Sequence, residues 1–372
     1  MITPEQAQSI ASTLLNDRTK GVEIECFIDR SKLTQIMSDL EELGHKVANL
    51  GYEDAKHQMR TDPFKYDFII TTDGSLERSQ SIPEIYIGKE FVTKPLHSNE
   101  LFKHIDDLTT VLNAHDSKVN GTCGLHMHID AKDFNAKNLR NALNFYKRYE
   151  KTLDCLVSPS RRGRGARYCT TTENLPNSLV NGANTSRGDR VSFNRSNNGE
   201  SIKYHKLNLR NYHSSGTIEF RHFNSTLDFS KIVGWCSLCD MITSKASKGQ
   251  SIDAPLAHRR NTMQGLYNLF LTLKLIRRDK GEVVPFSTEA YILCKWLNDR
   301  VKDNGFYNVA YKVNELEVVV NGQTIDNDLI QAKTEALKAL VKHINNSPLA
   351  SPVLTSFLSD ETIRLIASGV EI

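Results

Sequence analysis

The sequence predicts an α+β protein built on an antiparallel sheet. Over the first 245 residues, strand-like and helix-like segments mix without the strict strand–helix alternation that a parallel sheet requires. Three of the strand-like segments carry ionisable side chains at every second position, so each has one apolar and one ionisable face. From residue 246 onward the pattern becomes mostly helical, which predicts a C-terminal helical extension.

Short β-rich runs and alternation of apolar and polar residues place the expected strands. These are residues 21–28, 66–72, 84–87, 89–93, 123–130, 203–210 and 217–223. Apolar residues at helical spacing predict helices at 31–43, 99–114, 136–157, 232–244, 262–277, 287–302, 328–344 and 360–368. A β-rich patch at 317–320, followed by Asn321-Gly322, predicts a hairpin. We therefore expect one domain over residues 1–245 and a mostly helical region over 246–372.

The composition is that of a globular protein with an ordinary core. Of the 372 residues, 39% are hydrophobic and 24% are charged, which excludes wholesale disorder. A net charge of +3 is too small to indicate a polyanion-binding protein. No stretch is apolar and long enough for a membrane span, and the N-terminus does not have the pattern of a secretory signal. Because the seven cysteines form no disulfide framework, we expect a reduced, soluble, cytoplasmic protein.

The three ionisable strand faces form the candidate functional site. Each strand points two such side chains to one side: Glu23 and Glu25, His126 and His128, and Glu219 and Arg221. Asp73 and Glu90 add carboxylates at turn or strand positions. Carboxylates crowded on one sheet repel one another unless cations neutralise them. Carboxylate oxygens with an imidazole suit Mg²⁺ or Mn²⁺, and the absence of cysteine from these positions argues against structural zinc.

One such pair alone is more typical of a solvated strand face than of a metal site, but five ordered blocks are far more specific. The blocks are Gly21-Val-Glu-Ile-Glu25, Thr72-Asp-Gly-Ser-Leu76, Glu90-Phe-Val-Thr-Lys-Pro-Leu96, Gly124-Leu-His-Met-His128 and Thr217-Ile-Glu-Phe-Arg221. With these blocks the chain resembles, over roughly residues 20–230, the amidoligase family. That family belongs with glutamine synthetase and glutamate–cysteine ligase among the carboxylate–amine ligases.

The resemblance implies a fold and an activity. The fold would be glutamine synthetase-like, a curved antiparallel sheet with helices on one face and an active-site funnel on the other. Residues 1–245 would be the catalytic domain. The activity would be an ATP- and Mg²⁺- or Mn²⁺-dependent ligation that forms an amide or isopeptide bond through an acyl phosphate. The partners would be a carboxylate and an amine, either small molecules or groups of a macromolecule.

The resemblance also implies a role for each residue of the blocks. The metal ligands fall into two sets, Glu23, His126 and Glu219 for one ion, and Glu25, Glu90 and Asp73 for the other. His128 would lie near the nucleotide phosphates, and Arg221 would contact the phosphoryl group in transit. The catalytic residues would be Arg221, Glu90 and His128.

Two further segments supply candidate nucleotide or substrate contacts. On the expected strand 203–210, Lys206, Asn208 and Arg210 share one face, although a polar edge strand explains them equally well. Residues 159–200 are rich in arginine and lack periodicity, which is typical of a functional flap. Within this flap, Arg187 and Arg195 are candidates for a lid over ATP or for contact with an acidic or nucleic-acid substrate. A solvated loop is the alternative.

Other interpretations stay open on the sequence alone. A phosphotransferase similar to guanidino kinases would use a related sheet and would need no amine acceptor. A non-catalytic protein that binds a nucleotide or a nucleic acid would keep the fold but would not need every ligand position filled. Cys236 and Cys239 have redox-motif spacing, yet they fall in an expected helix, so we expect core thiols. Residues 246–372 are open to the roles of lid, homo-oligomer contact or partner dock.

Overall fold

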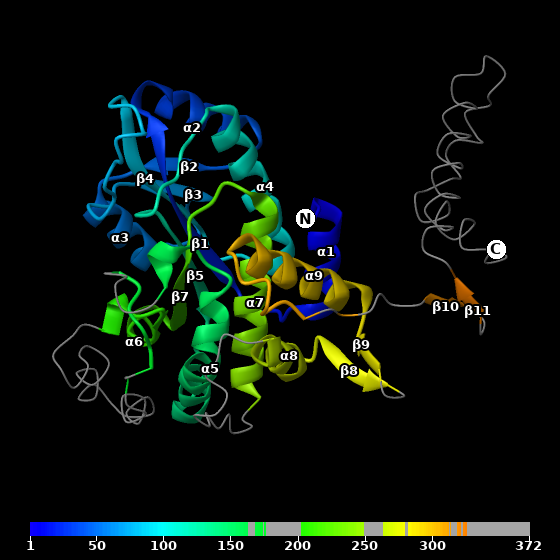
Figure 1. Cartoon of the computed structure of the whole chain (residues 1–372). Coiled ribbons are helices and arrows are strands. Elements are labelled where there is room, and N and C mark those ends of the chain that lie inside the picture. The colour runs from blue at the N-terminus through cyan, green and yellow to red at the C-terminus, as the bar shows by residue number, and fades with distance from the viewer. Residues whose placement is uncertain are drawn as a thin grey trace, which may run out of the picture. The chain divides into compact units, whose positions relative to one another are not determined.

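The chain divides into two compact units, Met1–Val313 and Asn314–Ile372. The computed structural model describes residues 1–162, 168–173, 175, 202–248, 263–279, 282–311 and 313, and the backbone of 318–320 and 323–325. The first unit is a mixed α+β structure around a large, mostly antiparallel sheet, which confirms the predicted class (Figure 1). In the second unit, β10 (Val318–Val320) and β11 (Gln323–Ile325) form the predicted hairpin.

Within the described residues, the main sheet has seven strands in the order β2-β3-β4-β1-β5-β7-β6. The strands are β1 (Lys20–Asp29), β2 (Val47–Asn49), β3 (Phe68–Thr71), β4 (Tyr86–Thr93), β5 (Gly124–Asp130), β6 (Leu207–Asn208) and β7 (Thr217–Asn224). Neighbouring strands are antiparallel except for β2 and β3. Strand β1 lies in the middle, so segments far apart in the sequence meet on its two sides.

Helices pack on the apolar face of the sheet, with α4 against β1 and α7 against β5. The helices are α1 (Pro4–Leu14), α2 (Leu33–Glu42), α4 (Ser98–Ala114), α5 (Ala136–Asp154), α7 (Phe229–Ser247), α8 (Met263–Thr272) and α9 (Thr288–Asp303). Helices α8 and α9 contact α5, α7 and α1, and they flank a hairpin of β8 (Ile276–Asp279) and β9 (Glu282–Pro285). None of the described helices combines the length and apolar character that a membrane crossing needs.

One short helix covers part of the other face of the sheet. Helix α3 (Tyr52–Thr61) contacts β3, and its Ala55 packs with Ile69 and Val92 in a small buried cluster. A single turn of helix, α6 (Tyr212–Ser215), precedes β7 and ends at Gly216, whose φ of 71° lies in the left-handed region. These elements border the face that carries the ionisable residues.

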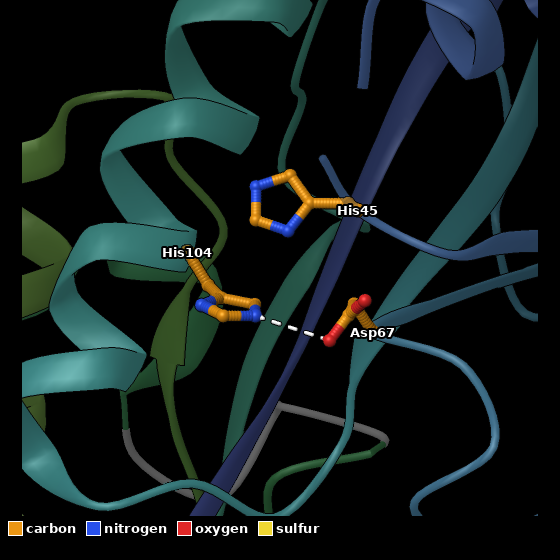
Figure 2. A group of neighbouring side chains, drawn as sticks. All are labelled: His45, Asp67 and His104. Atoms are coloured by element: carbon orange, nitrogen blue, oxygen red, sulfur yellow. Dashed lines mark hydrogen bonds and ion pairs between the residues drawn. The ribbon is translucent and has the colours of Figure 1, made fainter. Parts of the chain in front are cut away.

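Polar contacts of Asp67 fix the start of β3. Its carboxylate accepts the backbone N–H of Lys46 at 2.7 Å, pairs with Lys94 at 2.6 Å and faces His104 of α4 at 3.4 Å (Figure 2). Burial acts to raise the pKa of Asp67, but chiefly the N–H of Lys46 and the ammonium group of Lys94 outweigh it and lower the pKa to about 2. Helix α4 and the start of β3 are therefore joined through one carboxylate.

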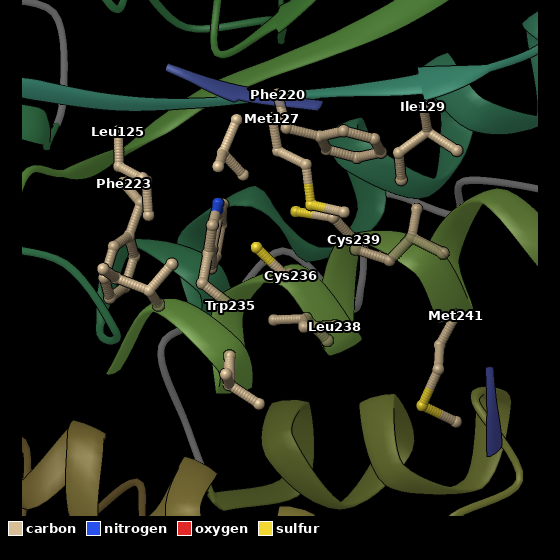
Figure 3. Packing of buried hydrophobic residues seen from close by; sticks show 14 of the residues in the cluster. Leu125, Met127, Ile129, Phe220, Phe223, Trp235, Cys236, Leu238, Cys239 and Met241 are labelled. Carbon is tan, nitrogen blue, oxygen red and sulfur yellow. The ribbon is translucent and has the colours of Figure 1, made fainter. Parts of the chain in front are cut away.

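The core lies between the sheet and helix α7. Met127 of β5 and Phe220 of β7 point toward Trp235, Cys236 and Cys239 of α7, and all five are buried (Figure 3). All seven cysteines of the chain are free thiols with buried side chains. The prediction that Cys236 and Cys239 are core thiols is therefore confirmed.

Several elements differ from the sequence predictions. The strands expected at 84–87 and 89–93 are one strand, β4, because its pairing with β1 continues through the intervening glycine. The strand expected at 203–210 keeps two residues, β6, after a 3-10 turn at Ile202–Tyr204. Elements α1, β2, α3 and the β8–β9 hairpin were not predicted. The helices expected at 328–344 and 360–368 lie outside the described residues.

Gly234 of α7 permits a close approach of α9. A Cβ at this position would overlap the indole ring of Trp296, which is not the free end of a flexible chain. We expect Gly234→Ala to lower the free energy of unfolding by about 1–3 kcal/mol, because the helices must separate to fit the methyl group. Gly121→Ala is the control, since its Cβ would meet no atom nearer than 3.6 Å. Urea denaturation measures both, and equal stability would contradict the packing of α9 on α7.

Candidate active site

The ionisable faces of four neighbouring strands meet through the register of the sheet. Across the β1–β5, β5–β7 and β1–β4 pairs, the residues that stand opposite each other are Glu23 and His126, His128 and Glu219, and Glu25 and Glu90. Opposed side chains on one face lie about 5 Å apart at their Cβ atoms. The structure therefore brings together side chains that the sequence predicted for a common site.

Glu23 is the centre of this group. Its Oε2 is 3.0 Å from Nδ1 of His126, and its Oε1 is 3.0 Å from Nε2 of His128. Nδ1 of His126 is also 4.0 Å from Oε1 of Glu219. Two sets of potential ligand atoms converge within 4.8 Å, namely Glu23, Glu90 and His126, and Glu23, His128 and Glu219. Glu23 belongs to both sets. The sequence prediction had instead assigned each residue to one ion only.

Arg221 lies at an irregularity in the pairing of β5 with β7. The register of β7 with β5 shifts here, so that Arg221 and His222 together stand opposite His126. Arg221 is buried and forms an ion pair with Glu219, on the face that the sequence predicted. His222 turns to the helical side, where its Nε2 is 2.7 Å from Oδ1 of Asp154.

Two amides hold the second oxygen of Glu219. Nδ2 of Asn208 donates to Oε2 at 2.5 Å, and Nδ2 of Asn211 donates to the same oxygen at 2.8 Å. Asn208 was a predicted substrate contact, but in the structure its side chain donates a hydrogen bond to Glu219, a carboxylate of the site. Asn211 was not predicted, because it follows the strand in a turn where the two-residue period no longer applies.

The carboxyl groups of the site have pKa values shifted in opposite directions. Burial, and then the neighbouring Glu23 and Glu25, raise the pKa of Glu90 well above its usual range. Burial also acts to raise the pKa of Glu23, but His128 and His126 outweigh it and hold that pKa well below its usual range. Because the Glu23 and Glu90 carboxyls are in hydrogen-bond contact, a proton or another cation is needed between them.

Glu25 and Asp73 lie beside this centre. Oε2 of Glu25 accepts the backbone N–H of Gly124 at 2.5 Å, and its Oε1 is 3.8 Å from Nε2 of His126. Burial raises the pKa of Glu25, although His126 opposes the rise. Asp73 lines the cavity described below, and its Oδ1 accepts the N–H of Ser75 at 2.7 Å.

Lys206 does not face the site. Its side chain is fully buried, and Nζ is 2.9 Å from Oε1 of Glu150 and 2.5 Å from Oδ1 of Asp154, both in α5. Burial acts to lower the pKa of Lys206, but these carboxylates raise it. The prediction that Lys206 and Asn208 share a strand face is wrong, because the strand there has only two residues. Arg187 and Arg195 lie outside the described residues.

A cavity of about 1010 Å³ opens over the site. The site residues that line it are Glu23, Asp73, Glu90, His126, His128, Glu219 and Arg221. Helix α3 adds a wall that includes Tyr52, Lys56 and Met59. Further cationic residues also line it, including Lys94, Lys132, Lys203 and Arg210. An anionic floor with cationic walls can hold divalent ions and a polyphosphate together.

A comparison with known families identifies the family of the chain. A sequence model of the family described as "Putative amidoligase enzyme" matches residues 16–243. The chain belongs to this family, as the five sequence blocks predicted, and the family is one of ligases by its description. The matched stretch runs from the turn before β1 into α7, so it contains every residue of the cavity lining. No curated protein matches the chain.

The pKa of His128 tests the charge arrangement. Burial acts to lower it, but Glu23 and Glu219 raise it to about 9, so the imidazolium persists through neutral pH in the metal-free protein. We expect Glu23→Gln to lower this pKa by about 1–2 units, since it removes an opposite charge in direct contact. NMR titration of the imidazole resonances measures the shift.

The control is Glu84→Gln, which changes an exposed carboxylate that pairs with Arg78. This variant is expected to leave the titration of His128 unchanged. A His128 that titrates near the ordinary value of 6.5 in the unsubstituted protein would contradict the arrangement.

Proposed function

We propose that the protein is an ATP- and Mg²⁺-dependent carboxylate–amine ligase that forms an amide or isopeptide bond. Its family supports a ligase. The observation that carries the proposal is the convergence on Glu23 of two carboxylate–imidazole sets beside the buried Arg221. An antiparallel sheet with helices on one face and a cavity over the other supports a glutamine synthetase-like fold.

The donor set fits divalent cations. Glu23 and Glu90 are two carboxyls in contact, and a divalent ion in place of the proton would relieve their repulsion. Oxygen-rich ligation with one imidazole suits Mg²⁺ or Mn²⁺. The residues that would hold two ions are Glu23, Glu90 and His126 for one, and Glu23, His128 and Glu219 for the other. Such ions, when bound, supply positive charge to the oxygens of a triphosphate.

The residues of the chain suit the activation of a carboxylate. A carboxylate oxygen attacks the γ-phosphorus of ATP, the bond from that phosphorus to the bridging oxygen breaks, and ADP leaves. The amine nitrogen then attacks the acyl carbon and loses a proton, and the carbon–oxygen bond to phosphate breaks. Arg221, held by Glu219, stabilises the charge on the phosphoryl oxygens in transit. His128 lies at the same floor of the cavity and, as a neutral imidazole, would help to hold one of the two ions.

Product analysis tests this function. The protein is incubated with ATP, Mg²⁺ and pools of acids and amines, and the products are identified by mass spectrometry. A ligase gives a product lighter by one water than the sum of one acid and one amine, and releases phosphate only when both are present. A phosphotransferase on a related sheet would give a phosphorylated product without the amine. A non-catalytic binding protein would give neither product.

Arg221→Ala is expected to reduce turnover by about 10²–10³, the usual loss on removal of one well-placed charge stabiliser. Arg30→Ala is the control, because Arg30 is exposed and does not line the cavity. Steady-state phosphate release measures both variants, and circular dichroism confirms that each is folded. Turnover close to that of the unsubstituted protein in Arg221→Ala would exclude the assigned role.

Glu23→Gln is expected to weaken Mn²⁺ binding at both sets, because Glu23 belongs to each. Glu219→Gln removes a ligand from one set and is expected to leave the other ion bound. Electron paramagnetic resonance of free Mn²⁺ gives the number of ions bound by each variant. Equal losses in the two variants would show that Glu23 is not shared.

A further inference from the structure

We propose that His45, Asp67 and His104 form a second metal site, for a divalent transition metal ion such as Zn²⁺. The three residues come from three segments, since His45 precedes β2, Asp67 precedes β3, and His104 lies in α4. Their side chains converge on one point (Figure 2). None of them lines the cavity of the candidate active site.

The spacing of the donor atoms suits zinc. One ligand atom from each residue lies within 4.8 Å of the other two. Nε2 of His104 is 3.4 Å from Oδ1 of Asp67. Tetrahedral ligands about 2.0–2.1 Å from zinc are roughly 3.3–3.4 Å apart, so this pair already has the required separation.

The other nitrogen of each imidazole already has an acceptor. Nε2 of His45 is 2.9 Å from Oδ2 of Asp107, and Nδ1 of His104 is 2.9 Å from the carbonyl oxygen of Glu100. With protons on these nitrogens, Nδ1 of His45 and Nε2 of His104 have the lone pairs that a metal needs. Histidines that bind metals usually donate their other N–H to a carboxylate or a carbonyl in this way.

The composition of this site differs from that of the candidate active site. Two imidazoles and one carboxylate favour zinc or another transition metal, whereas the candidate active site has more carboxylates and suits Mg²⁺ or Mn²⁺. Side chains of His45, Asp67 and His104 are 7%, 13% and 13% exposed, so each keeps some contact with solvent.

Lys94 competes for this site. Its Nζ is 2.6 Å from Oδ1 of Asp67, the oxygen that also faces His104. The ammonium group and a metal ion would compete for that oxygen, because both are cations. The Lys94 side chain is 26% exposed and can leave, and the residue also lines the cavity. Loss of the Lys94 charge is therefore expected to tighten metal binding.

The test uses Co²⁺ as a visible-absorption probe and Zn²⁺ as competitor, with the metal-free full chain. All variants carry Glu23→Gln, so that the candidate active site contributes little. We expect visible bands of four-coordinate Co²⁺ that Zn²⁺ removes. His104→Asn is expected to weaken Co²⁺ binding by about tenfold or more, and Lys94→Met to tighten it. His97→Asn is the matched control, because His97 directly precedes the same helix and is exposed.

Each outcome decides the proposal. Bands that are absent, or that persist unchanged in His104→Asn, overturn it. Unchanged affinity in Lys94→Met overturns the assignment of Asp67 as a ligand, and this variant also decides the matter if His104→Asn fails to fold. Weaker binding in His97→Asn would show that surface histidines hold the ion.

Discussion

The structure of the site depends on one electrostatic constraint, which is that several carboxylates are buried together at the middle of the sheet. Glu23, Glu90 and Glu219 occupy neighbouring strands, and the side chains of Glu90 and Glu219 are almost completely buried. A buried charge without a partner costs several kcal/mol, so each needs a proton, a donor or a cation. The two histidines, Arg221 and the amides of Asn208 and Asn211 supply part of that need.

The other face of the sheet also contains buried charges, but these are paired within the protein. Nζ of Lys20 is 3.1 Å from Oδ1 of Asp240 in α7, with both side chains almost inaccessible. Lys206 likewise pairs with Glu150 and Asp154 of α5. These pairs attach helices to strands. At the floor of the cavity, the carboxylates of Glu23, Glu90 and Glu219 outnumber the one guanidinium of Arg221, and a site with unbalanced charge next to open space is suited to bind cations.

Strand periodicity explains why so much of the site could be predicted. Residues i and i+2 of a strand share a face whatever the strand pairs with, so Glu219 and Arg221 were correctly assigned to one side. The same argument failed for Lys206, where the extended conformation lasts for two residues. Strand periodicity could not identify Asn211, because Asn211 lies in a turn. It also could not identify Arg161, a buried neighbour of Glu25 in the segment that was expected to be a flap.

The sequence by itself determined the α+β class, the family, and which side chains share a strand face, because these follow from local periodicity and ordered blocks of residues. Only the tertiary structure decided that Glu23 stands opposite His126, that a register shift leaves Arg221 and His222 together opposite His126, and that His45 meets Asp67 and His104. Register and bulges depend on hydrogen bonds between strands that lie many residues apart, and no local pattern encodes them.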